Sequence, residues 1–267
     1  MNRFSAFILD CDGVIWKGSH VIPGAREVIN ILRENGKLVL FVTNNASLSR
    51  RTYAEKMRSL GFDVDPKEIY CSSYVTAMLL SGKVERVYVI GEEGLVEELE
   101  LAGLKSVDSD KAECVVVGLD RGLTYSKLSK ALACLLRGAL FVATNRDPTL
   151  PTESGLALGA GAIVAALEAA SGRSVDLVAG KPFPFMFELA LKDWNLEASK
   201  TLVVGDRLDT DVVGAKRAGL VSALVLSGVT SLDEVQSAKV SPDFVLRSIT
   251  DLVSLDLGHN YRAIRSS

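Results

Sequence analysis

Two aspartates separated by a single residue follow an apolar run near the start of the chain, in AFILDCDG (residues 6–13). Carboxylates this close raise one another's pKa, so a cluster of them does not stay fully ionised without a cation. Magnesium suits such a cluster, because it binds few carboxylates and completes its shell with water and a phosphate oxygen. Asp10 and Asp12 therefore favour phosphate chemistry assisted by a divalent cation.

Other reactive side chains follow apolar runs further along the chain. They are Thr43, Asn44 and Asn45 after KLVLFV, Lys181 after DLVAG, and Asp206 after TLVVG, with Asp209 and Asp211 close behind. Each motif alone, the first pair included, has an ordinary structural interpretation. DCDG can be an acidic turn, TNN a capped helix start, GKP a solvated lysine before a helix, and GDRLDTD acids at the positive end of a helix. Together they point to one site, because sites in open α/β sheets form beyond the carboxyl ends of the strands.

A phosphoryl-transfer site would divide its work among these residues. Asp10 is the predicted nucleophile, which forms an aspartyl-phosphate. Asp12 is the predicted general acid that protonates the leaving oxygen, and then the base that deprotonates the attacking water. Thr43 and the backbone near Asn44 and Asn45 are expected to hold the phosphoryl oxygens, and Lys181 to neutralise their charge.

The predicted Mg²⁺ ligands are the carboxylates of Asp10 and Asp206. Asp211 is expected to support this site from behind the ligands. Asp209 is left as a solvated side chain.

Strand and helix patterns alternate through most of the chain, which predicts an α/β protein with a parallel sheet covered by helices on both faces. The predicted strands are continuous apolar runs, as suits strands buried on both faces; they span 6–10, 37–43, 86–91, 113–119, 139–144, 201–206 and 222–227. Helical patterns cover 24–36, 52–61, 125–138 and 162–172.

Composition narrows the possible functions. The chain has 267 residues, 48% of them hydrophobic, and a formal net charge of −3. That balance argues against nucleic acid or a membrane surface as the main partner. No apolar run is long enough for a membrane span, and Asp10 interrupts the apolar stretch near the N-terminus, so no signal peptide is expected. The four scattered cysteines fit a reducing, cytoplasmic setting.

The motifs DCDGV (10–14), VTNN (42–45), GKP (180–182) and GDRLDTD (205–211) resemble, in order, the four motifs of the haloacid dehalogenase (HAD) superfamily. With its second aspartate, Asp12, the first motif resembles that of the phosphatase branch of this superfamily. VIWKGSHVIPG (14–24) and ATNRDP (143–148) are similar to subfamily IIA, which includes 4-nitrophenylphosphatases, phosphoglycolate and pyridoxal phosphatases and NagD-like enzymes. The resemblance implies a magnesium-dependent phosphomonoester hydrolase for small phosphorylated metabolites, with the backbone carbonyl of Asp12 as a further Mg²⁺ ligand.

The same resemblance implies a Rossmann-like core over 1–79 and 179–267, with a smaller α/β cap domain of the C2 type inserted at 80–178. Its loop at Asn145, Arg146 and Asp147 is expected to lean over the site and select the substrate. A homodimer formed through the cap is a further implication.

Two other motifs with similar residues do not fit this sequence. A calcium-binding EF-hand starting at Asp10 would place Gly18 and Val21 where ligands are needed. A Walker loop at Lys181 would need Ser or Thr where Pro182 stands. The alternatives left open are a non-catalytic phosphometabolite-binding or regulatory protein of the same fold and, more remotely, a phosphotransferase.

Overall fold

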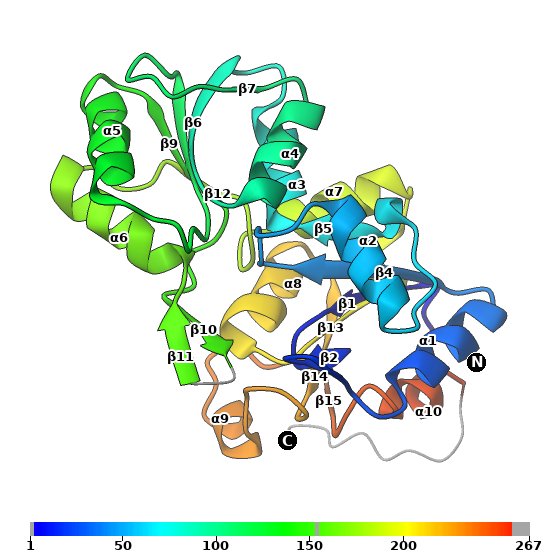
Figure 1. The fold of residues 1–267 in the computed structure, drawn as a ribbon. Helices are drawn as coiled ribbons and strands as arrows, with labels where there is room; N and C mark the ends of the chain where they lie inside the picture. Colours follow the sequence, from blue (N-terminus) through cyan, green and yellow to red (C-terminus); the bar gives the residue numbers. More distant parts are fainter. Residues whose placement is uncertain (1–2, 153–154, 258–267) are drawn as a thin grey trace. The chain divides into compact units, whose positions relative to one another are not determined.

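The computed structural model describes residues 3–152 and 155–257, which divide into two compact units (Figure 1). The first unit takes in the described residues up to Thr43, then Met57–Ile69, and those from Lys181 onwards. The second comprises Asn44–Lys56 and Tyr70–Gly180. The predicted cap at 80–178 lies inside the second unit, which also takes in residues 44–56 and 70–79. That the second unit acts as a cap stays a prediction.

The first unit is built on a six-stranded sheet in the order β15-β14-β13-β1-β4-β5, whose last strand, β5, begins in this unit at Ile69 and continues into the second. The strands are β1 (Ala6–Asp10), β4 (Leu38–Thr43), β5 (Ile69–Cys71), β13 (Thr201–Gly205), β14 (Val221–Val225) and β15 (Phe244–Leu246). The pairs β1–β4, β1–β13, β13–β14 and β14–β15 are parallel. Every residue of β1 and of β13 is buried, which suits the apolar residues that make up most of both strands.

Helices and short strands complete the first unit. They are β2 (Trp16–Lys17), β3 (His20–Val21), α1 (Ala25–Glu34), the 3₁₀ turns Pro66–Glu68 and Ala198–Lys200, α7 (Phe185–Asp193), a π-helix at Leu208–Val212, α8 (Val213–Arg217), α9 (Leu232–Gln236) and α10 (Asp251–Leu257). Helix α1 shows why these segments are helical. It buries Ala25, Val28, Ile29 and Leu32 along one stripe at helical spacing.

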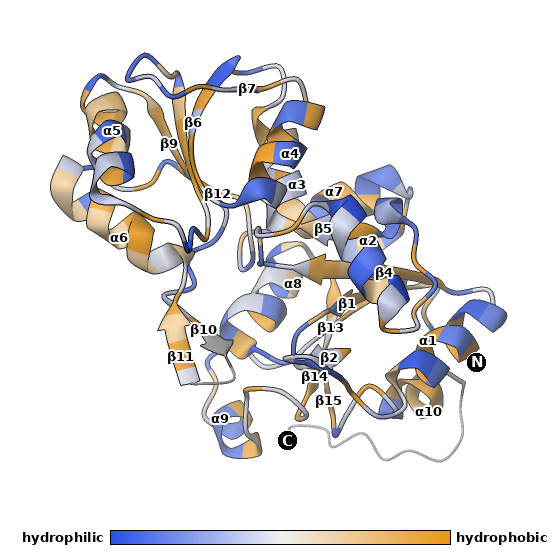
Figure 2. Ribbon diagram, in the orientation of Figure 1, coloured by the Kyte–Doolittle hydropathy of each residue, from blue (hydrophilic) through white to orange (hydrophobic). Residues whose placement is uncertain are grey.

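The second unit has a five-stranded parallel sheet in the order β12-β9-β8-β6-β7. Its elements are α3 (Ser72–Leu80), β6 (Arg86–Ile90), α4 (Glu93–Leu101), β7 (Lys105–Ser106), β8 (Cys114–Val117), α5 (Tyr125–Leu136), β9 (Leu140–Ala143), the hairpin β10 (Thr149–Thr152) and β11 (Gly155–Leu158), α6 (Ala160–Ser171) and β12 (Leu177–Val178). Helix α2 (Arg50–Ser59) begins in this unit and ends in the first. Figure 2 shows the strands β6 and β9 coloured as hydrophobic.

The predicted α/β architecture is confirmed, and each of the seven predicted strands and four predicted helices overlaps an observed one. The parallel strands form two sheets, and the strand before Lys181, β12, belongs to the second. Among the described residues, none of the helices is long and apolar enough to cross a membrane.

Candidate active site

Three of the predicted site residues lie at the ends of adjacent strands in the first unit. Asp10 ends β1 and pairs in register with Val42, so Thr43 is one residue beyond that pair. Leu9 pairs with Val204 of β13, two residues before Asp206. Parallel strands end at the same edge of a sheet, and this register therefore brings a carboxylate, a hydroxyl and a second carboxylate together.

Lys181 and Asp211 complete the cluster from outside the sheet. The Lys181 Nζ donates to Asp10 Oδ1 at 2.5 Å and to Asp211 Oδ1 at 2.6 Å. The other carboxylate oxygen of Asp211 accepts from the Arg207 backbone N–H at 3.1 Å. Asp211 is only 1% exposed and lies on the π-helix, an irregularity often found at functional sites. Asp211 therefore fixes the position of the lysine that contacts the predicted nucleophile.

Asp206 lies in a cradle formed by two glycines. A Cβ added to Gly13, whose φ is +80°, would come within 2.3 Å of Asp206 Oδ2, and one on Gly228 within 2.0 Å. The same oxygen accepts from the Val229 backbone N–H at 2.8 Å. Only glycine permits this close approach at both positions. The carboxylate is thus held against the loop that follows β14.

The cluster is short of positive charge. Burial, opposed by Lys181 and reinforced by Asp211 and Asp206, raises the pKa of the Asp10 carboxyl well above its ordinary range. Burial and the nearby Asp211 raise the pKa of Asp206 to about 6. For Lys181, burial acts against the ammonium form, but the carboxylates of Asp10 and Asp211 outweigh it and raise its pKa. Asp10 and Asp206 therefore resist ionisation while Lys181 stays charged.

A divalent cation fits this charge distribution. Asp10, Asp206 and Asp211 each offer a carboxylate oxygen, and these oxygens lie within 4.8 Å of one another. When all three are ionised, their negative charges face one ammonium, which leaves an excess that a doubly charged ion would balance. Both carboxylate oxygens of Asp211 already accept hydrogen bonds, one from Lys181 and the other from the Arg207 backbone N–H. Asp10 and Asp206 are therefore the better placed ligands.

Asp12 has a different environment from Asp10. Its side chain is exposed, and its Oδ1 accepts a hydrogen bond of 2.9 Å from the indole Nε1 of Trp16. Trp16 itself is only 1% exposed. An accessible carboxyl held by a buried ring suits a group that exchanges protons with substrate and water.

Asn44 and Asn45, predicted to bind substrate, belong to the second unit and make contacts there. The Asn44 side-chain amide donates to Asp147 Oδ2 at 3.1 Å. The Asn45 side-chain oxygen accepts from the Ser47 backbone N–H at 2.9 Å. These bonds shape the turn after β4, and substrate binding by the two residues stays a prediction.

The predicted specificity loop is held by several bonds within the second unit. The Asn145 amide donates to the Asn44 carbonyl at 2.7 Å, and its side-chain oxygen accepts from the Asp147 backbone N–H at 3.0 Å. Arg146 forms an ion pair of 2.7 Å with Glu168 on α6. The loop is therefore fixed to both Asn44 and α6, although its role in specificity stays a prediction.

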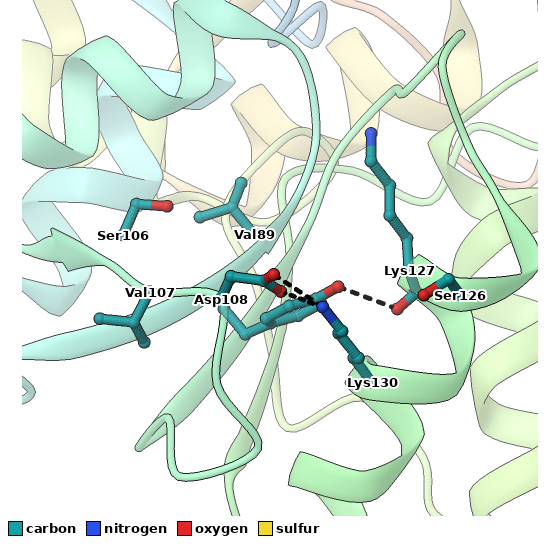
Figure 3. A pocket seen from close by; sticks show the side chains of 8 residues that line it. Val89, Ser106, Val107, Asp108, Ser126, Lys127 and Lys130 are labelled. Atoms are coloured by element: carbon teal, nitrogen blue, oxygen red, sulfur yellow. Dashed lines mark hydrogen bonds and ion pairs between the residues drawn. The ribbon is translucent and has the colours of Figure 1, made fainter.

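A pocket of about 260 Å³ in the second unit contains none of the predicted site residues (Figure 3). Its two lysines are already paired: Lys130 lies 2.7 Å from Asp108, and Lys127 lies 2.6 Å from Asp120. Because the charge of both lysines is already compensated by aspartates, this pocket is a poorer candidate for binding phosphate than the cluster around Lys181 in the first unit.

Two contributors to the site were missed from the sequence. One is the loop after β14, where Gly228 and Val229 hold Asp206. Its signal was the Ser-Gly pair that ends the run SALVLSG (222–228), the same strand-end position as the other site residues. The other is Trp16, whose only signal was its closeness in sequence to Asp12.

Comparison with known proteins gives an independent assignment of the chain. The family model described as haloacid dehalogenase-like hydrolase matches residues 7–105, and one described as HAD-hydrolase-like matches residues 178–252. The chloroplastic phosphoglycolate phosphatase 1A of Arabidopsis thaliana is 40% identical over 282 residues, which cover 95% of this chain and 78% of that protein.

Solved structures agree with the sequence comparison. The 4-nitrophenylphosphatase of Thermotoga maritima superposes with a TM-score of 0.90 at 35% identity, covering 95% of this chain and 97% of that one. The glycerol phosphate phosphatase of Mycobacterium tuberculosis, solved in complex with magnesium, gives a TM-score of 0.88 at 38% identity, covering 94% and 76%. The similarity therefore extends over both units.

Proposed function

This chain is a member of the haloacid dehalogenase-like hydrolases, in the subfamily that includes the phosphoglycolate phosphatases and 4-nitrophenylphosphatases, and from that premise we propose that it is a magnesium-dependent phosphomonoester hydrolase. One observation carries the proposal: Asp10 lies 2.5 Å from the buried ammonium of Lys181, within a cluster of three carboxylates that could hold a divalent cation. This combination supplies a nucleophile, a charged phosphate ligand and a metal site together.

In the proposed first step, a carboxylate oxygen of Asp10 attacks the phosphorus atom of the substrate. A bond forms between that oxygen and phosphorus, and the bond from phosphorus to the ester oxygen breaks. Asp12 gives its proton to the departing oxygen, which leaves as an alcohol. Asp10 then carries an aspartyl-phosphate, and Asp12 is a carboxylate.

The second step returns the enzyme to its starting state. Asp12 takes a proton from a water molecule, and the resulting hydroxide attacks phosphorus. The bond between phosphorus and the Asp10 oxygen breaks, which releases inorganic phosphate. Asp12 is again protonated and Asp10 is again a free carboxylate.

The remaining residues hold the phosphoryl group while these bonds change. Lys181 balances negative charge on the phosphoryl oxygens, and its bond to Asp211 fixes its position. Thr43, at the end of β4, offers its hydroxyl to one of those oxygens. Asp10, Asp206 and the backbone carbonyl of Asp12 would hold Mg²⁺, which when bound supplies positive charge to the phosphate and to the crowded carboxylates.

The proposed substrates are small phosphorylated metabolites, by analogy with the phosphoglycolate, glycerol phosphate and 4-nitrophenyl phosphatases to which the chain is similar. The loop at residues 145–147 is the proposed selector among them. A cytoplasmic location and a homodimer formed through the second unit accompany this proposal.

The test is a panel of phosphomonoesters incubated with the purified chain and Mg²⁺, with phosphate release measured as kcat/KM. The proposal expects turnover of at least one small monoester. Binding of phosphometabolites without any turnover would instead support the non-catalytic alternative.

A further inference from the structure

We infer that Trp16 is a positioning residue for proton transfer: its indole N–H fixes the Asp12 carboxyl so that Oδ2 carries the exchanged proton. The inference rests on the proposed function of Asp12. Its starting point is the hydrogen bond of 2.9 Å from Trp16 Nε1 to Asp12 Oδ1. The residues involved all belong to the first unit.

The chemistry of indole determines which oxygen carries the proton. Its N–H group donates a hydrogen bond and cannot accept one. Asp12 Oδ1 must therefore be the acceptor whether the carboxyl is charged or neutral. The proton that Asp12 gives to a leaving oxygen, and later takes from water, is consequently carried on Oδ2.

Trp16 is a firm support because it cannot move easily. It is among the largest fully buried side chains, at 1% exposure, and it pairs with Val21 in the short β2–β3 ladder. Asp12, in contrast, is exposed. An exposed aspartate ordinarily samples several rotamers, and a bond from a fixed donor favours one of them.

The backbone between the two residues is also closed on itself. The Ile15 and Trp16 N–H groups both donate to the Cys11 carbonyl, at 2.9 and 3.2 Å, and the Gly13 N–H donates to the Trp16 carbonyl at 2.7 Å. The Ser227 hydroxyl holds the Gly13 carbonyl at 2.8 Å. These bonds close the turn between Asp12 and Trp16, and the turn therefore sets the distance between the indole and the Asp12 carboxyl.

A purely structural interpretation exists, in which Asp12 merely satisfies a buried N–H group. The two interpretations differ in their dependence on the leaving group. An alkyl phosphate must expel an alkoxide and needs a proton donor, whereas 4-nitrophenyl phosphate expels a stabilised phenolate and needs little help. Loss of proton positioning harms the first reaction selectively, but loss of structure harms both equally.

The experiment measures kcat/KM for an alkyl monoester, glycerol 3-phosphate or phosphoglycolate, and for 4-nitrophenyl phosphate. This parameter reports the first step, in which the leaving group departs. For Trp16→Phe, we expect the alkyl-to-aryl ratio to fall about five- to tenfold, the effect of one hydrogen bond. Asp12→Asn should change the ratio in the same direction and further. Equal loss on both substrates, or an unchanged ratio, would overturn the inference.

A second variant covers the case in which Trp16→Phe folds poorly. The chain has two tryptophans, Trp16 and Trp194. In a Trp194→Phe background, Trp16 is the one that remains, so replacing tryptophan with 3-benzothienylalanine during expression changes position 16 alone. This residue keeps the fused ring but replaces N–H with sulfur. The alkyl-to-aryl ratio should fall as in Trp16→Phe, and an unchanged ratio in a folded protein refutes the inference.

Failure of the inference can be told from failure of the proposed function by the unmodified enzyme. If that enzyme hydrolyses neither class of monoester, the proposed function fails and the inference with it. If it hydrolyses both and the variants keep their ratio, only the role of Trp16 is wrong.

Discussion

Removing the Asp206 carboxylate should change how the stability of the metal-free protein depends on pH. Burial and Asp211 raise the Asp206 pKa from 3.8 to about 6 in the folded chain. The folded state therefore holds the Asp206 proton more tightly than the unfolded state does. Binding of that proton favours the folded chain, and this stabilisation is lost as pH rises through the window from about 4 to 6. A shift of this size corresponds to about 3 kcal/mol of unfolding free energy.

The assay is urea unfolding in EDTA between pH 4.5 and 7.5, for the wild type and for Asp206→Asn, which keeps the shape but does not titrate. Relative to the variant, the wild type should lose about 2 to 3 kcal/mol over this range. Subtracting the variant removes the contributions of titrating groups that do not interact with Asp206, while its neighbour Asp10 contributes to the difference. Mg²⁺ should restore wild-type stability at pH 7.5 but not at pH 4.5. Parallel pH profiles for the two proteins would refute this reasoning.

Three further predictions concern the metal, the core and the second unit. EDTA should stop phosphate release and added Mg²⁺ should restore it; full turnover in a chelated sample would contradict the metal role. Lys37→Met should lower the unfolding free energy, measured by denaturant titration, by about 3 kcal/mol, because it leaves the buried Asp256 of α10, 2.6 Å from Lys37, without its ion pair. The double variant with Asp256→Asn should recover part of this loss. Asp147→Ala should lower the unfolding free energy by about 1 kcal/mol, because it removes the hydrogen bond that Asp147 accepts from Asn44. It should also change the order of kcat/KM values across the phosphomonoester panel; an unchanged order would show that this loop does not select the substrate.

Much of the fold could be predicted from the sequence because its information is local. Strands buried on both faces, such as β1 and β13, are unbroken apolar runs that end at Asp10 and just before Asp206. Once parallel pairing is assumed, these ends must share one edge of the sheet. The neighbourhood of Asp10, Thr43 and Asp206 followed from that geometry.

Other features depend on contacts between residues far apart in sequence, so no local pattern shows them. Lys181 follows β12, a strand of the second sheet, yet its ammonium contacts Asp10 of the first. The side chain of Asn44 is directed to Asp147 by a bond spanning over a hundred residues. Strands of two residues, such as β2 with Trp16, are too short to have a period, so the turn that brings Trp16 to Asp12 was not foreseen.

The central claim is that Asp10 is the nucleophile, and phosphate release by Asp10→Asn in saturating Mg²⁺ tests it most directly. The substitution should be confirmed by mass spectrometry at residue 10 before and after the assay, so that deamidation is excluded. The account predicts a folded protein whose turnover falls by at least about a thousandfold, because the amide cannot form the aspartyl-phosphate. Turnover close to that of the wild type, with asparagine intact at position 10, would contradict it.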